Sequence, residues 1–476
     1  ERWALGGMSE LCSFRQLLKM LPQLPSHGTL PAALSGRVPC NGARSSREWI
    51  PRVDPLVTAS GLGLLVGGLV SRHRSGPSRA SRASVPSKVV RNAEMDRSYL
   101  NFTGFPFPLG PVFARRTVRT QVGDGMWTFE QEQKLANIAV NVRMTAIKLE
   151  DGSLWVHNPV APTEECNALL RELGLPVKYI VLGSAQYEHK IFVAPFARRW
   201  PDAKVFTVQQ WSWPLDLPSA LYGIFGTELK DDEETPWSAE IDKKLLCPKD
   251  RLGLGYSASE CAFFHKRSKT LICTDALVYV PEEPPAVLDK EELKGLGRTA
   301  NNFILDLVAF VNWRGSGDRI RNAIAEEAKG GSPNDEALLR KGWQRDALLS
   351  LYFGPDGGSI VEPSQAFRSI AGRWIVGPVC YSLVYGGKIR DEVKEWSERL
   401  CEWDVQQILP GHFAGPVGGN QDDIRRAFEV LGENVEATEP PEFALPWPFP
   451  QAVRYPAEDL KLLTDIKAVL RTLNVI

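Results

Sequence analysis

The sequence is poor in the residues from which metal, redox and disulfide motifs are usually built. Its 476 residues include eight cysteines, none in a Cys-x-x-Cys pair, and only six histidines. The missing pairs exclude a zinc ribbon and a thioredoxin-type redox site. A chain of this length can bury enough apolar surface without disulfides, so we interpret the cysteines as buried free thiols.

Net charge is also nearly absent, at -1, and it is distributed unevenly. Residues 1–95 carry 13 Lys and Arg against 5 Asp and Glu, whereas the remainder carries 43 against 52. A nucleic-acid surface needs a basic surplus to displace counterions from phosphates, so the acidic body predicts no nucleic-acid partner. The sequence also lacks a Gly-x-Ser-x-Gly elbow and a glycine-rich phosphate loop.

Long apolar runs are missing as well. The uncharged stretch 56–70 would span roughly 23 Å as a helix, which is shorter than the hydrocarbon layer, and this predicts no stable membrane span in the mature body. It precedes a Ser- and Arg-rich stretch that is poor in acids. This bias predicts a targeting leader over residues 1–95, with a disordered tail as the alternative. The order resembles the bipartite leaders of proteins imported into complex plastids, so we expect a plastid (chloroplast) location.

After residue 101 the pattern predicts alternating strands and helices. Residues 143–150 and 153–160 are apolar-rich and flank Asp151-Gly152, a dipeptide that favours a hairpin turn. Thr163 is predicted to cap a helix that has apolar residues along one face and ends at Gly174. Residues 177–182 are predicted to be a short buried strand.

The second half predicts a hairpin over 261–274, a helical insertion at about 285–372 and a strand over 405–409, followed by a helix that Asn420 caps. We assign residues 96–437 to one α/β domain. Residues 438–476 are predicted to be a proline-rich linker and a C-terminal amphipathic helix that packs on the body.

Four candidate ligands follow predicted strands. Glu188 and His189 lie on one loop, Asp275 on a second and His412 on a third. Side chains just past strand ends converge on one rim in α/β folds. Two imidazoles and two carboxylates suit zinc and also admit iron or manganese. The alternative is separate strand-end residues that bond nearby backbone.

The remaining candidates have a structural and a functional interpretation each. His157 follows the first hairpin and either supports the ligands or bonds backbone, and His265 is predicted to be exposed in a basic turn. Trp211 and Trp213 either line a pocket or belong to the core.

The order of these elements resembles the metallo-β-lactamase superfamily. More narrowly, residues 179–190 (Tyr-Ile-Val-Leu-Gly-Ser-Ala-Gln-Tyr-Glu-His-Lys) and 263–275, which end in Thr-Asp, are similar to a plant and cyanobacterial domain-of-unknown-function family numbered 4336. The resemblance covers roughly residues 100–435. It implies a metallo-β-lactamase-like four-layer αββα sandwich with a helical insertion.

The resemblance also implies where a site lies and how it departs from the superfamily. The His-x-His-x-Asp-His motif falls on Ser184, Gln186, Glu188 and His189, and the middle histidine falls near Tyr256. The first of two metal positions therefore loses its three histidines.

The second metal position is kept. It comprises Glu188, His189, Asp275 and His412, with a glutamate where the superfamily has an aspartate. The resemblance therefore implies one divalent ion, zinc foremost. Two carboxylates weaken such an ion as a Lewis acid, so we expect modest hydrolysis of a small ester, thioester or phosphoester. Asp275 and Tyr256 are the candidate catalytic residues, Tyr256 either as a donor to a developing oxyanion or as an ordinary half-buried tyrosine.

Two other functions stay open. The lost first position is also compatible with a non-catalytic binding or assembly module on the same fold, and the ligand set with an iron-dependent oxidoreductase. The expected partner is a small-molecule substrate, and the sequence does not predict an oligomeric state.

Overall fold

The structure is a computed structural model, and it describes residues 98–100, 112–135, 138–210, 219–249, 258–298, 334–432 and 455–472. The predicted leader, Tyr256, Trp211 and Trp213 lie outside the described residues.

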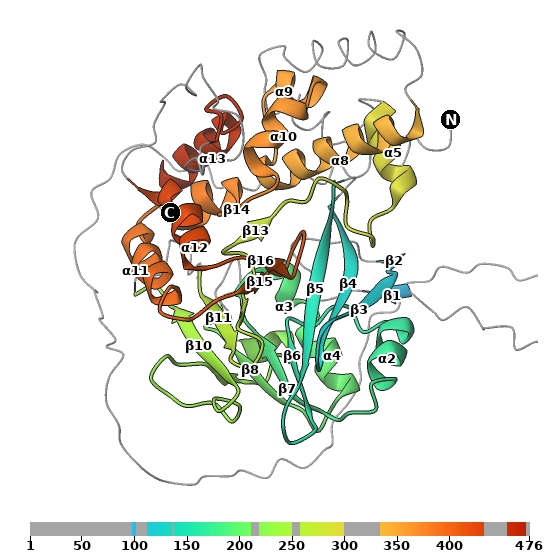
Figure 1. The fold of residues 1–476 in the computed structure, drawn as a ribbon, viewed down its shortest axis with the longest axis vertical. Coiled ribbons are helices and arrows are strands. Elements are labelled where there is room, and N and C mark those ends of the chain that lie inside the picture. The colour runs from blue at the N-terminus through green and yellow to red at the C-terminus, as the bar shows by residue number, and fades with distance from the viewer. Residues whose placement is uncertain are drawn as a thin grey trace, which may run out of the picture. The chain divides into compact units, whose positions relative to one another are not determined.

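The larger sheet has seven strands in the order β3-β4-β5-β6-β7-β8-β9 (Figure 1). It is antiparallel from β3 to β6 and parallel from β6 to β9. The predicted hairpin joins β5 to β6, and Gly152 in its turn has a φ of +80°, which glycine adopts without strain. The strands are β3 (Thr117–Gly123), β4 (Met126–Leu135), β5 (Ile138–Lys148), β6 (Leu154–His157), β7 (Val177–Leu182), β8 (Lys204–Thr207) and β9 (Thr227–Glu228).

The smaller sheet has five strands in the order β10-β11-β12-β15-β16. Its strands β12 and β15 are parallel neighbours although 134 positions separate Ile272 from Gln407 along the sequence, so their carboxyl ends meet at one edge. The strands are β10 (Ile241–Leu246), β11 (Glu260–His265), β12 (Thr270–Ile272), β15 (Gln407–Leu409) and β16 (Val417–Gly418). Two short pairs complete the described strands: β1 (Ser98–Leu100) with β2 (Val112–Ala114), and β13 (Val278–Tyr279) with β14 (Trp374–Ile375).

Three apolar clusters define four layers. One lies between the sheets and joins Trp155 and Tyr179 of the larger sheet to Phe263 of the smaller. The second packs α2 (Glu164–Arg171) and α4 (Val193–Arg199) on the outer face of the larger sheet. The third packs α11 (Arg390–Leu400) and α12 (Gln421–Phe428) on the outer face of the smaller sheet. The predicted αββα order is confirmed.

Two of these helices begin where the sequence predicts. Thr163 caps α2 by accepting a hydrogen bond from the backbone N–H of Cys166. Asn420 caps α12, and a reciprocal bond from the backbone N–H of Asn420 to the side chain of Asp423 completes a capping box. Such a cap contributes about 1 kcal/mol to helix stability.

The described part of the predicted insertion is helical and adjoins the end of the sandwich where β5 begins (Figure 1). Its helix α8 contacts β5 through Asp346, whose Oδ1 accepts a hydrogen bond from the backbone N–H of Ala139 at 2.9 Å. The helices are α5 (Lys290–Arg298), α8 (Asp335–Tyr352), α9 (Gly357–Val361) and α10 (Ser364–Ile370).

The chain continues through a π-helical turn and ends in a helix that packs on it. The turn is η3 (Cys380–Tyr385), and α13 (Lys461–Thr472) lies against it. Leu463 of α13 is fully buried, and Lys467 donates to the carbonyl of Gly386 at 3.1 Å. The other short helices are α3 (Tyr187–Lys190), η1 (Ser219–Tyr222) and η4 (Glu429–Leu431).

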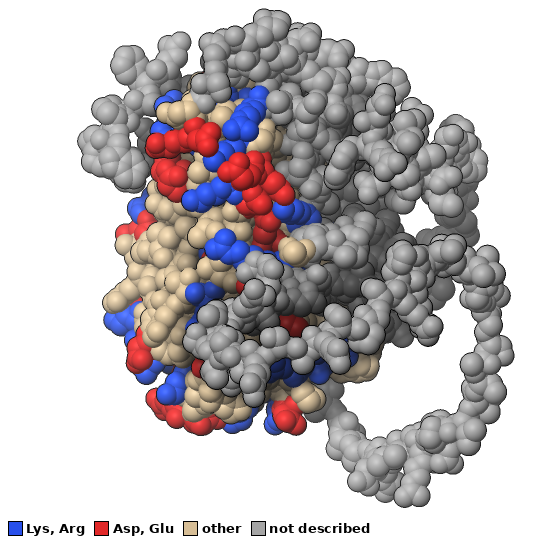
Figure 2. All heavy atoms as spheres, turned by 90° about the vertical axis from the view of Figure 1, so that its right-hand side faces the viewer, with Lys and Arg blue, Asp and Glu red and all other residues tan. Residues whose placement is uncertain are grey.

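The described surface mixes both signs of charge. On the face drawn in Figure 2, blue Lys and Arg alternate with red Asp and Glu over the described residues. The ion pairs of the described residues include that of Lys294 with Asp335, at 2.9 Å. Among the described helices, none is both long enough and apolar enough to span a bilayer.

Candidate metal centre

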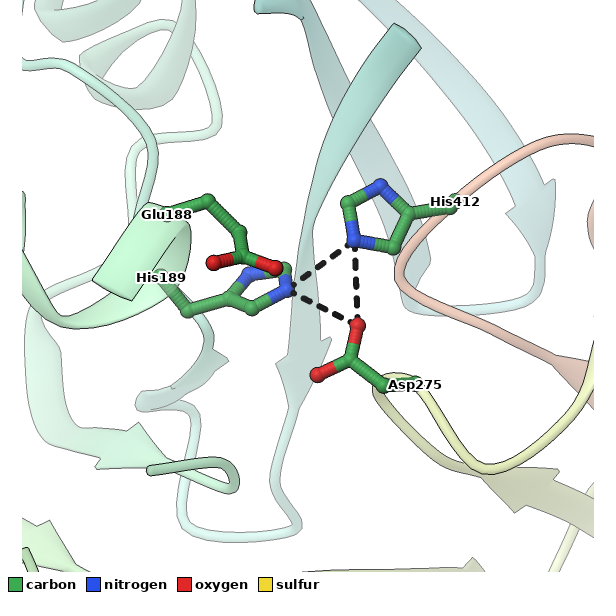
Figure 3. Close-up of side chains that lie close together, drawn as sticks. All are labelled: Glu188, His189, Asp275 and His412. Atoms are coloured by element: carbon green, nitrogen blue, oxygen red, sulfur yellow. Dashed lines mark hydrogen bonds and ion pairs between the residues drawn. The ribbon is translucent and has the colours of Figure 1, made fainter. Parts of the chain in front are cut away.

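Three loops that follow strand ends bring the four predicted side chains together (Figure 3). β7 leads through residues 183–186 into α3, which carries Glu188 and His189. β12 leads to Asp275, and its parallel neighbour β15 leads to His412. Asp275 and His412 are therefore adjacent because their strands are paired, although they are far apart in the sequence.

Backbone hydrogen bonds between the two sheets bring α3 to the other two loops. The carbonyl of Gly183 accepts from the N–H of Cys261 at 2.8 Å, and the N–H of Ala185 donates to Ser259 at 3.1 Å. Between them Ser184 pairs with Glu260 as an antiparallel bridge. The extension of β7 thus becomes a neighbour of β11, which fixes where α3 begins.

The ligand atoms of the four side chains all lie within 4.8 Å of one another. The two imidazole Nε2 atoms of His189 and His412 are 3.1 Å apart, and Asp275 Oδ1 lies 3.5 Å from the first and 3.1 Å from the second. Figure 3 shows the carboxylate of Glu188 beside the ring of His189. His189, Asp275 and His412 are buried, whereas Glu188 is half-buried.

His412 is oriented by Asn141 of β5. The backbone carbonyl of Asn141 lies 2.9 Å from His412 Nδ1, and its side-chain amide exchanges two hydrogen bonds with the backbone of Phe413. A carbonyl oxygen can only accept, so Nδ1 carries the proton and Nε2 of the neutral ring carries a lone pair. This is the arrangement typical of a metal-binding histidine and its supporting residue.

Arg143, two residues further along β5, supports the same loop. Its guanidinium is buried and donates to the carbonyls of Pro410 and Phe413, and it pairs with Glu130. Gly411 fits between the ligand loops because a Cβ there would lie 3.0 Å from the carbonyl oxygen of Thr274. The residues on both sides of His412 are therefore fixed by buried contacts.

Asp275 is held on its other oxygen by Ser184. The Ser184 hydroxyl donates to Asp275 Oδ2 at 3.0 Å, which leaves Oδ1 turned toward the two imidazoles. Behind it, Asn158 links the loops by donating to the hydroxyl of Thr274 at 2.9 Å and accepting from the N–H of Gly183 at 2.9 Å. The carboxylate is thus oriented by contacts with both loops.

The electrostatics favour positive charge at the centre of the cluster. Burial opposes ionisation of Asp275, but the imidazoles of His189 and His412 outweigh it and hold the pKa of Asp275 far below its usual range. Burial likewise opposes protonation of His412, yet its hydrogen bond to Asp275 and the charges of Asp275 and Glu188 raise its pKa. Both shifts express one preference, which is for a cation among these ligand atoms.

The residues fit a divalent metal ion. Ligand atoms bound tetrahedrally at about 2.0–2.1 Å lie about 3.3–3.4 Å apart, and at an octahedral site about 3.0 Å apart. The three separations here, 3.1, 3.5 and 3.1 Å, fall around both values. Two nitrogens and two carboxylates are ligands that zinc, iron and manganese accept.

His157 lies behind the cluster. Its imidazole stacks on Trp155 with centroids 5.6 Å apart and meets Phe263 edge-on at 5.3 Å, and its Nε2 is buried without a hydrogen-bond partner. Burial, and then the positive charge of His189, lower the pKa of His157 to about 3. Aromatic packing therefore holds His157 in place, and the backbone hydrogen bond that the sequence suggests is not among its described contacts.

This shift predicts a pH-dependent contribution to stability. The pKa of His157 is about 3 when folded and about 6.5 when unfolded, so its contribution is complete above pH 6.5 and is lost as the pH falls toward 3. From pH 7 to pH 4.5 the loss should be about 2–3 kcal/mol. Urea unfolding should show that His157→Met loses less stability than wild type over this interval. Equal losses of stability in His157→Met and wild type would contradict the lowered pKa of His157.

His265 is not exposed, which corrects the prediction from the sequence. It is the last residue of β11, pairs with Thr270, is 2% exposed, and bonds Ser268 Oγ through Nδ1 at 2.7 Å. Burial lowers its pKa to about 4. With the β3–β4 and β5–β6 turns it lines a cavity of about 320 Å³ at the opposite end of β11 from the cluster. Lys266 and Arg267 of the turn are exposed, whereas His265 belongs to the strand and is buried.

Comparison with known proteins identifies the family. The profile of a domain of unknown function, DUF4336, matches residues 123–370 and 361–430. The chain belongs to this family. The matched part contains all four residues of the cluster, so the cluster lies within the DUF4336 domain. No curated protein matches the chain.

Several solved structures are similar to this DUF4336 protein. A metallo-beta-lactamase from Pontibacter korlensis is 12% identical with a TM-score of 0.32, over 67% of this chain and 100% of that one. The flavodiiron protein from Giardia intestinalis is 11% identical with a TM-score of 0.36, over 67% and 60% of the two chains. Rubredoxin oxygen:oxidoreductase from Desulfovibrio gigas is 11% identical with a TM-score of 0.34, over 66% and 60%.

Proposed function

We propose that this protein is a metal-dependent hydrolase-like protein with a single divalent ion held by Glu188, His189, Asp275 and His412. One observation carries the proposal. His412 Nε2, His189 Nε2 and Asp275 Oδ1 face one another at 3.1–3.5 Å, while the proton of His412 is held on Nδ1 by Asn141.

Such a cluster requires a cation. The lone pair on His412 Nε2 faces a carboxylate oxygen at 3.1 Å, and two lone pairs at this distance repel in a buried site. Either a second proton on the ring or a metal ion removes the repulsion. A proton satisfies one pair of atoms, whereas an ion satisfies all four side chains together, which favours the ion.

The residues around Asp275 favour one ion rather than two. Its Oδ2 accepts a hydrogen bond from Ser184, so one oxygen is left for an ion. Ser184 and Gln186 also stand where the superfamily resemblance places imidazoles. A hydroxyl and an amide are weaker ligands for zinc or iron than imidazole, which supports a mononuclear centre.

The chemistry follows from this ligand set. When bound, a divalent ion lowers the pKa of a coordinated water from 15.7 to about 7 in favourable sites, which makes hydroxide available at neutral pH. Glu188 lies at the half-buried side of the cluster, whereas Asp275 stays ionised because the imidazoles hold its pKa low. Two carboxylates reduce the net charge at the centre. We therefore infer slow hydrolysis of a small ester, thioester or phosphoester, in a plastid as the leader composition suggests.

Metal content and activity of the full chain test the proposal together. Elemental analysis after reconstitution with zinc, iron or manganese should find about one equivalent of metal. Nitrophenyl acetate, nitrophenyl phosphate and an acyl thioester are the substrates to assay, and turnover should vanish on chelation. Less than about a tenth of an equivalent of every metal would exclude a metal centre.

A non-catalytic binding or assembly module is the second candidate, because Ser184 takes the place of a superfamily histidine and ties up Asp275 Oδ2. It predicts stoichiometric metal or none, and no turnover on any of the three substrates. Binding partners would then be retained by the double variant Asp275→Ala with His412→Ala, since a scaffold does not need the ion.

A further inference from the structure

A buried carboxylate outside the four ligands shapes the loop that carries Asp275. Glu260 is the first residue of β11 and is 2% exposed. Its Oε1 accepts hydrogen bonds from three consecutive backbone N–H groups, those of Thr274 at 2.8 Å, Asp275 at 3.1 Å and Ala276 at 3.2 Å. The superfamily resemblance assigns no function to this position.

Three successive N–H groups converge on one oxygen only where the backbone curls around it. Without the carboxylate, three buried donors would be left unpaired, which is unfavourable for each of them. The loop would then relax to reach water or other acceptors. The conformation of residues 274–276 therefore depends on Glu260.

The second oxygen of Glu260 is also engaged. Its Oε2 accepts a hydrogen bond from the hydroxyl of Tyr385 at 3.0 Å, and Tyr385 is itself 2% exposed. Tyr385 ends the π-helical turn η3, and π-helical turns occur often at functional sites. The carboxylate of Glu260 cannot rotate without losing either Tyr385 or the three N–H groups.

Glu260 and Ser184 hold Asp275 from two sides. Ser184 pairs with Glu260 through the backbone and binds Asp275 Oδ2 through its hydroxyl, while Glu260 binds the backbone of the Asp275 loop. Together they leave Asp275 Oδ1 pointing at His189 and His412. A different curl of the loop would turn this oxygen away from the imidazoles.

We propose that Glu260, held in place by Tyr385, is the positioning residue that presents Asp275 to the metal ion. This proposal rests on the proposed metal centre for its consequence, but its structural basis is independent of any ion. It also connects η3, and through it α13, to the centre.

Two variants of Glu260 test the proposal in the full chain. Glu260→Ala removes both acceptors, whereas Glu260→Gln keeps an oxygen for the three N–H groups and an amide for Tyr385. The first readout is hydrogen exchange of the amides of residues 274–276 in metal-free protein. Wild type and Glu260→Gln should protect them, and Glu260→Ala should not.

The second readout is the affinity and the visible spectrum of bound cobalt(II). Glu260→Ala should weaken cobalt affinity about 10–100-fold, as loss of a supporting residue usually does, and change the spectrum. Glu260→Gln should restore both. Tyr385→Phe should also weaken cobalt affinity, but by less than Glu260→Ala. Tyr352→Phe is the control, because it removes a tyrosine hydroxyl that is bonded to Ser369, and it should match wild type.

The outcomes separate the two proposals. Unchanged amide protection and unchanged cobalt binding in Glu260→Ala would overturn the role of Glu260. If wild type binds no metal, the metal centre fails, and the amide exchange still decides whether Glu260 shapes the loop. If Glu260→Ala does not fold, the comparison of Tyr385→Phe with Tyr352→Phe takes its place. Loss of amide protection at residues 274–276 in Tyr385→Phe alone supports the positioning role of Glu260. Equal protection in the two variants overturns it.

Discussion

Replacing His412 with alanine should nearly abolish metal binding, and of the site variants it should have the largest effect. Loss of a residue that only supports a ligand costs about 10–100-fold in affinity, so loss of the ligand itself should exceed this range. The imidazole of His412 also lies 3.1 Å from both His189 Nε2 and Asp275 Oδ1, so its removal opens two of the three short contacts of the cluster. Titration with zinc in competition with a chromogenic chelator measures the change.

The matched control is His265→Ala. His265 is also a buried histidine but lies at the other end of β11, away from the cluster. Zinc should raise the melting temperature of wild type and of His265→Ala, because binding stabilises the folded state by mass action, and it should leave His412→Ala unchanged. Similar zinc affinity in the two variants would show that the cluster does not hold the ion.

Much of the fold follows from local patterns in the sequence. The strand 177–182 and the caps at Thr163 and Asn420 are where the sequence predicts them. These features depend on residues within a few positions of each other, which is why sequence reasoning finds them. The sequence analysis does not predict the hairpin β3–β4. Asp124-Gly125 marks its turn, but its strands contain few apolar residues in strict alternation, so the strand signal is weak.

The candidate ligands were also accessible to sequence reasoning, because they follow strand ends and carry metal-binding side chains. The residues that orient them were not. Asn141 and Arg143 lie inside β5, and Glu260 opens β11, so their function depends on which loop the register of the sheet places beside them. A polar residue at a fully buried strand position is the one signal in the sequence that marks them.

The same limit applies to His265. A histidine beside Lys266 and Arg267 in a hairpin turn suggests exposure, but His265 is the last residue of β11, and all six residues of that strand are buried. The strand includes His265, so its ring points into the molecule while the next two residues face solvent. An error of one residue in the end of a strand therefore reverses the predicted burial.

Alanine at Gly342 should destabilise the protein by about 3 kcal/mol or more, the upper end of the range for overpacked cores. Gly342 lies where α8 crosses α5, and a Cβ there would lie 1.8 Å from the backbone oxygen of Leu293 and 2.6 Å from its carbonyl carbon. Both clashing atoms belong to a helix backbone, so neither can move without displacing α5. The reciprocal contact of Gly297 with the backbone oxygen of Leu338, at 2.2 Å from a Cβ, fixes the same crossing.

Gly295→Ala is the matched control, because Gly295 lies in α5 and a Cβ there would meet nothing within 4 Å. Alanine is a better helix former than glycine by about 1 kcal/mol, so this variant should be as stable as wild type or slightly more stable. Urea unfolding of the three proteins measures both effects. Asp346 connects α8 to Ala139, which lies two residues before Asn141 in β5, and Asn141 orients His412. A displaced α8 should therefore also disturb the orientation of His412. Gly342→Ala should then bind zinc more weakly than Gly295→Ala. Equal stability of the two variants would mean that α5 and α8 do not cross at Gly342.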